Sequence, residues 1–179
     1  MKKIRHRFRL YLVRRGLKSA TRKRRVNSYS DAVQIGLLCE ATGETDVAFI
    51  RSLTDQLKSD LKNTTVVLYS GKKPLLSGLE LPEQTYPVTE KDFSWLLKPK
   101  NEALATFAGM ELDLLIDLTS TRAYGMKYLA AVSQAAYKTG AYNNDYNDIY
   151  DLLLQVDETC SVSDLYNHIL HYLKMIKTK

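Results

Sequence analysis

The sequence predicts an α/β protein, a three-layer Rossmann-like or flavodoxin-like domain with a mostly parallel sheet of about five strands. Two observations lead to this class. Apolar runs of strand length are continuous rather than alternating, which is typical of strands buried on both faces, and segments with helical periodicity separate them. A third feature is a strongly basic start. We therefore divide the chain into a basic helical arm with its linker, residues 1–30, and a single α/β domain, residues 31–179.

The arm is expected to be helical up to Gly16. Its apolar residues Ile4, Phe8 and Leu12 recur at helical spacing rather than in alternation. The following segment, 19–30, is polar, rich in serine and turn-prone, and it is interpreted as the linker.

The domain opens with a strand, a helix and a second strand. Residues 33–39 are continuously apolar, residues 47–61 carry an apolar residue every three or four positions, and residues 65–69 are β-branched and apolar. This succession predicts a βαβ unit with parallel strands and a right-handed crossover.

The next segment, 70–100, contains all four prolines and is expected to be irregular, with a short edge strand near 86–88. A short helix over 102–108 and a buried strand over 112–118 follow. In flavodoxin-like order, this strand joins the sheet beside the first one.

The last part of the chain continues the alternation. A helix is predicted over 126–136, followed by strands at 137–142 and 149–156. Ser161 and Asp164 have the spacing of a capping box and predict the start of a final helix. One face of that helix is expected to carry Leu165, Ile169, Tyr172 and Ile176.

The charge distribution is the main indication of function. Of the 26 basic residues, 12 lie in the first 25 positions, where there is no acidic residue. The remaining 14 bases and 20 acids give residues 26–179 a formal charge of −6. Such cationic density suits a polyanion, because each base that neutralises a phosphate releases counterions.

We therefore predict a non-catalytic nucleic-acid-binding protein. RNA or a ribosomal particle is the expected partner, since no DNA-groove-reading motif is present. The predicted contacts are Lys2, Lys3, Arg5, Arg7, Arg9, Arg14, Arg15, Lys18, Arg22, Lys23, Arg24 and Arg25. Two alternatives remain open: a merely solvated charge run, and a basic amphipathic helix lying on an anionic membrane surface.

A small ligand-binding or enzyme domain is a further alternative. Ligands of parallel sheets bind outside the carboxyl ends of the strands, where Thr42, Thr119, Ser120, Thr121 and Arg122 are expected. These hydroxyls and the arginine suit a phosphate at a helix N-terminus, but the same residues also suit simple helix capping.

No catalytic or metal-binding motif is found. The two cysteines and three histidines lack metal-ligand spacing, so neither a metal nor a cofactor is expected. Cys39, at the end of an apolar run, is predicted to be a buried small hydrophobe. No segment reads as a signal peptide or a membrane span, and we expect a cytoplasmic protein.

The chain contains the segments "FSWLLKPKNEALATF", "LDLLIDLTSTRAYGMKYLAAVSQAAYKTGAYN" and "YDLLLQV". In the sequence and order of these three segments, the chain resembles an uncharacterised family of Bacteroidota proteins, a domain of unknown function. That resemblance implies a single Rossmann-like domain and a cytoplasmic location, and no catalytic residue. The second of these segments is also similar to the N-terminal half of two-domain glycosyltransferases such as heptosyltransferases, and the nucleotide-binding half of those enzymes has no counterpart here.

Overall fold

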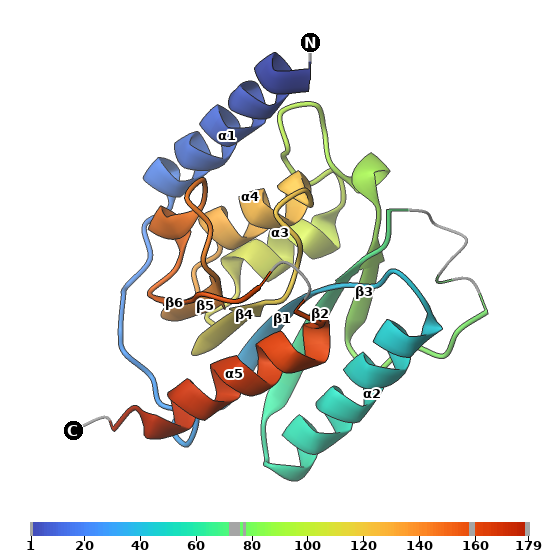
Figure 1. Cartoon of the computed structure of the whole chain (residues 1–179), viewed down its shortest axis with the longest axis vertical. Helices are drawn as coiled ribbons and strands as arrows, with labels where there is room; N and C mark the ends of the chain where they lie inside the picture. The colour runs from blue at the N-terminus through green and yellow to red at the C-terminus, as the bar shows by residue number, and fades with distance from the viewer. Residues whose placement is uncertain (1, 72–75, 77, 158–159, 178–179) are drawn as a thin grey trace.

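A computed structural model describes residues 2–71, 76, 78–157 and 160–177, and these residues form an α/β domain with one parallel sheet (Figure 1). The strands are β1 (Gln34–Glu40), β2 (Asn63–Tyr69), β3 (Thr85–Val88), β4 (Leu114–Asp117), β5 (Tyr137–Ala141) and β6 (Leu152–Leu154). The helices are α1 (Lys2–Ser19), α2 (Glu44–Ser59), α3 (Glu102–Gly109), α4 (Tyr124–Val132) and α5 (Val162–Met175), with 3₁₀ turns η2 (Glu90–Asp92) and η3 (Asn147–Ile149).

The strand order is β3-β2-β1-β4-β5-β6, and every neighbouring pair is parallel. Without β3, the other five strands have the flavodoxin order that the sequence predicts. The short edge strand expected near 86–88 is β3, and it pairs with β2 from Val66 to Tyr69. Its addition gives the doubly wound Rossmann order, which changes direction between β1 and β4.

Helices cover both faces of the sheet, which explains why the strands are apolar throughout. On β1, Leu37 and Cys39 face α2 and α5, whereas Leu38 faces α3 and α4. Cys39 is fully buried, as predicted, and burial raises the pKa of its thiol. The carboxyl ends of the strands and the loops that follow them meet at one edge.

The basic helix α1 forms an additional layer outside α4 (Figure 1). Leu12 and Val13 of α1 are buried in the same apolar cluster as Leu129 and Ala130 of α4. The arm is therefore helical, as expected, and its inner face is part of the core.

Gly16 allows α1 to approach α4 closely. A Cβ atom at this position would lie 2.8 Å from Cε2 of Tyr128 and 3.0 Å from Cγ1 of Val132. The helix does not end at Gly16, as the sequence suggests, but continues to Ser19. The glycine serves helix packing here, and the loss of helix propensity at one position is outweighed by burial of the apolar face.

Two expectations about helices are corrected by tertiary contacts. The helix predicted over 126–136 ends at Val132, because the N–H groups of Gln134 and Ala136 donate to the carbonyls of Ala108 and Leu112 instead. On α5, Tyr172 is exposed, and Leu173 is buried in its place. Ser161 caps α5 by accepting a hydrogen bond from the N–H of Asp164, as predicted.

Replacing Gly16 with leucine is expected to separate α1 from α4, because the new side chain would overlap the Tyr128 ring. Amide hydrogen exchange should then become faster in α1 by at least tenfold and remain slow in β1 and β4. Ser19→Leu, at an exposed position of the same helix, serves as the control. Unchanged exchange of α1 in Gly16→Leu would contradict the packing described here.

Candidate nucleic-acid interface

The outward face of α1 carries a basic stripe, which we define as Lys3, Arg7, Arg14 and Lys18. These residues are spaced so that they share one side of the helix, and all four are exposed. None of them forms a salt bridge with a described residue. Tyr11, also exposed, lies between them.

The other predicted contact residues divide into two groups. Arg5, Arg15 and Lys23 are exposed like the stripe, while the side chain of Lys2 lies outside the described residues. Arg9, Arg22, Arg24 and Arg25 instead contact the domain, Arg24 through a salt bridge with Asp151 at 3.8 Å.

Arg22 is an anchor rather than an exposed base. Its guanidinium donates to both carboxylate oxygens of Asp151, at 2.7 and 2.8 Å, and to the carbonyls of Ala135 and Ala136. Only 5% of its side chain is exposed. Arg25 similarly pairs with Asp113 at 3.0 Å, although most of its side chain remains in solvent. Segment 20–33 is thereby fastened to the domain.

An exposed aromatic pair lies beside the N-terminal half of α1. The rings of Phe8 and Trp95 are stacked, with centroids 6.2 Å apart and an interplanar angle of 8°. Trp95 is 77% exposed and Phe8 is 43% exposed. An aromatic surface next to a row of arginines is the combination on which single-stranded nucleic acids stack.

Backbone hydrogen bonds hold the loop that carries Trp95 in one conformation. The N–H of Ser94 donates to the carbonyl of Lys98 at 2.8 Å, and Phe93 forms a bridge with Pro99. Leu97 closes the turn with a φ of 62°, and its buried side chain holds this conformation in place. Trp95 is therefore displayed by a fixed turn.

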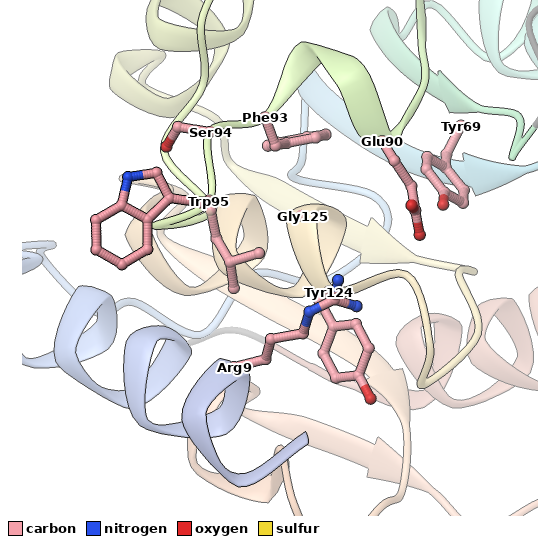
Figure 2. Close-up of a pocket in the computed structure, with 9 residues that line it drawn as sticks. Arg9, Tyr69, Glu90, Phe93, Ser94, Trp95, Tyr124 and Gly125 are labelled. Carbon is pink, nitrogen blue, oxygen red and sulfur yellow. The ribbon is translucent and has the colours of Figure 1, made fainter. Parts of the chain in front are cut away.

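A pocket of about 190 Å³ lies between α1, this loop and the start of α4 (Figure 2). It is lined by Arg9, Tyr69, Glu90, Phe93, Ser94, Trp95, Leu97, Tyr124 and Gly125. The guanidinium of Arg9 lies 4.6 Å from the centroid of the Tyr124 ring. We call this space the aromatic pocket.

Backbone and burial define the aromatic pocket further. A Cβ atom on Gly125 would lie 2.5 Å from the Phe93 ring, so glycine is required for Phe93 to form the wall. Burial, followed by the nearby Glu90 carboxylate, raises the pKa of Tyr69 to about 12. Tyr69 is therefore a neutral hydrogen-bonding group at physiological pH.

A second cleft, of about 640 Å³, lies at the carboxyl ends of β1 and β4, where the strand order changes direction. It brings together Thr42, Thr119, Ser120, Thr121 and Arg122, the five residues that the sequence proposes for a ligand. We call it the switch-point cleft. Helix α4 begins after Ala123 without a side-chain cap, so the three hydroxyl residues do not cap it.

The groups of the switch-point cleft are largely engaged with one another. Thr42 donates from its N–H and its hydroxyl to Asp46, and the N–H of Ser120 donates to Glu40. Three carboxylates also line the cleft, those of Glu40, Asp46 and Asp157. Their negative charges repel a phosphate and so oppose its binding.

Comparison with family models agrees with the resemblance to a domain of unknown function and does not address the Bacteroidota origin or the likeness to glycosyltransferases. A family model described as "Family of unknown function (DUF6913)" matches residues 5–176. The chain belongs to this family. No curated protein and no solved structure matches it. The matched region includes α1 from residue 5 onward.

A buried polar cluster fixes the start of α4, between the two pockets. The Nζ atom of Lys127 donates to Asp117 at 3.0 Å and to the carbonyl of Thr119, while the hydroxyl of Tyr150 donates to Asp117 at 2.5 Å. The N–H and hydroxyl of Thr119 complete the cluster by donating to Asp117. Removing one partner of such a buried ion pair costs about 3–5 kcal/mol.

Another buried lysine, Lys138, holds the opposite end of α4. Its Nζ atom donates to the carbonyls of Ala130 and Ala131 in the last turn, where cations are favourable. Burial, followed by the charge of Arg22, lowers the pKa of Lys138 to about 7. Charges on Asp151 and Arg24 act in opposite directions on the same group.

The low pKa of Lys138 predicts a pH-dependent stability. Its unfolded pKa is 10.5, so the chain takes up a proton on unfolding between pH 7 and 10.5, and the free energy of unfolding rises with pH in this range. The slope is at most about 1.4 kcal/mol per pH unit. The slope can be measured by urea denaturation of wild type and Lys138→Met between pH 7.5 and 9.5, a range in which tyrosine side chains remain largely protonated. The wild type should gain stability relative to the variant as pH rises, and parallel curves would contradict the prediction.

Sequence reasoning identified the basic residues and the switch-point residues but not the aromatic pocket. Tyr69, Glu90, Trp95 and Tyr124 are far apart in the chain and belong to no motif. The one available signal was Trp95, the single tryptophan, within a segment of prolines and lysines.

Proposed function

We propose that the protein is a non-catalytic nucleic-acid-binding protein whose ligand is single-stranded RNA. The observation that carries this proposal is the basic stripe of α1, presented on a docked helix next to the exposed Phe8–Trp95 pair. A ribosomal particle in the cytoplasm is the partner that we propose in the cell.

The stripe supports binding to a polyanion because it is fixed in place. Arg7 and Arg14 lie on a helix whose inner face is buried, so little backbone order has to be gained on binding. Arginine grips phosphate with two parallel hydrogen bonds, and its planar group also stacks on bases.

The aromatic pair favours a single strand over a duplex. Trp95 stands out from a rigid turn, and unpaired bases can stack on such a ring, whereas bases within a duplex are already stacked. Exposed lysines of the same segment, Lys91 and Lys98, add positive charge near it.

The packing of α1 argues against a membrane surface as the partner. An interfacial helix inserts its apolar face into lipid, but Leu12 and Val13 are buried against α4. No helix among the described residues has the length and apolar character needed to cross a bilayer.

Charge reversal on the stripe tests the proposal better than deletion, because removing α1 would expose the apolar surface of α4. The double variant Arg7→Glu/Arg14→Glu should bind an oligouridylate of about 12 nucleotides at least tenfold more weakly than wild type, measured by fluorescence anisotropy. The slope of log affinity against log salt should become shallower by about 1.4, since two phosphate contacts are lost.

The matched control is Lys58→Glu/Lys174→Glu, which makes the same charge change at exposed positions on α2 and α5. This variant should retain most of the affinity. Equal losses in both double variants would indicate a net-charge effect and overturn the proposal, as would competition by phosphatidylserine vesicles instead of RNA.

The switch-point cleft supports a second candidate, a small-ligand-binding or glycosyltransferase-like domain. It is favoured by the convergence of five predicted residues on one cleft. In that case, Arg122→Ala should abolish the thermal stabilisation produced by a nucleotide sugar, and the stripe variant should not affect it. If no nucleotide sugar raises the melting temperature of the wild type, this candidate is abandoned.

A further inference from the structure

We infer that the aromatic pocket receives an unpaired guanine base of the bound RNA, an inference that rests on the proposed function. The pocket borders α1 at Arg9 and shares Trp95 with the exposed aromatic pair. A strand that is bound along α1 and stacks on Trp95 would therefore bring a base to its opening.

The size and walls of the pocket suit a planar base. Its volume of about 190 Å³ exceeds the roughly 150 Å³ of a protein cavity that holds a benzene ring. Figure 2 shows the rings of Phe93, Trp95 and Tyr124 around this space, with the guanidinium of Arg9 over Tyr124. Aromatic rings are surfaces on which proteins stack unpaired bases, which leaves Arg9 to meet an edge of the base.

The polar groups of the pocket select among the bases. Figure 2 shows Glu90 beside Tyr69, on the side of the pocket away from Trp95. Glu90 is exposed, and its carboxylate forms no side-chain hydrogen bond or ion pair among the described residues, so a ligand in the pocket can reach it.

Guanine matches both charged groups. Its N1–H and N2–H donors lie side by side and fit the two oxygens of a carboxylate, while its O6 and N7 acceptors fit an arginine. Adenine presents a lone pair at N1, which a carboxylate repels. Cytosine offers a single donor beside a lone pair, and the one imide N–H of uracil lies between two carbonyl oxygens. Glu90 and Arg9 together therefore favour guanine.

The pocket is preorganised for this role. The turn that carries Trp95 is fixed by the Ser94–Lys98 hydrogen bond, and Arg9 is held over Tyr124 by the docking of α1. Since Arg9 belongs to α1, the same docked helix would supply the phosphate contacts and one wall of the base pocket.

The test compares oligouridylates of about 12 nucleotides that carry one central guanine, one central adenine or no substitution. Wild type should bind the guanine oligonucleotide about tenfold more tightly than the adenine one, as expected for a bidentate contact. In Glu90→Gln this ratio should fall to near one, with little change in affinity for the unsubstituted oligouridylate. Glu111→Gln, at an exposed glutamate just before the amino end of β4, should keep the ratio.

The outcomes separate this inference from the proposed function. Equal affinities of wild type for all three oligonucleotides, with the salt dependence of a phosphate binder, would overturn the guanine pocket and leave RNA binding intact. A guanine preference that persists in Glu90→Gln would also overturn it. Failure to bind any of the three would overturn both.

Discussion

The position of the basic helix α1 depends on how helix α4 is fixed, because α1 packs against α4. At its start, Lys127 is bonded to Asp117 at the end of β4, and at its end, Lys138 donates to the last carbonyls. Both lysines are buried, so each must have its hydrogen-bond partners to offset the loss of hydration. A helix held at both ends presents a constant surface, and α1 packs on that surface through Gly16.

The basic residues of the first 25 positions serve two purposes that composition cannot distinguish. Arg22 and Arg25 neutralise Asp151 and Asp113 and attach the segment to the domain. The bases of the stripe point outward and have no acidic partner among the described residues. The acidic character of the domain is thus partly used to hold the basic segment, which leaves the outer face of α1 as a concentrated positive surface.

The sequence predicted much of the fold because its elements have strong local signals. The βαβ unit of β1, α2 and β2 follows directly from apolar runs and helical periodicity, and the capping box identifies the start of α5. The premature end of α4 was not predictable, since the backbone of Gln134 and Ala136 bonds to residues distant in the chain. Gly16 is a similar case. Its sequence context predicts the end of a helix, but its role is set by packing against Tyr128 and Val132, which are distant in the chain.

The two candidate sites also differ in how far the sequence could predict them. The switch-point residues follow the carboxyl ends of β1 and β4, so topology alone brings Thr42 and Arg122 into one cleft. The aromatic pocket depends on the docking of α1 and on the turn that closes at Leu97, and neither has a sequence signature. Tertiary packing, rather than local sequence, places Trp95 beside the arginines of α1.

The most direct measurement of the central claim is amide hydrogen exchange of the intact protein with and without an oligouridylate. We predict that bound RNA slows exchange in α1 and in residues 93–97, and leaves the loop from Thr119 to Arg122 unchanged. Slower exchange confined to the Thr119–Arg122 loop, with α1 unaffected, would contradict the account.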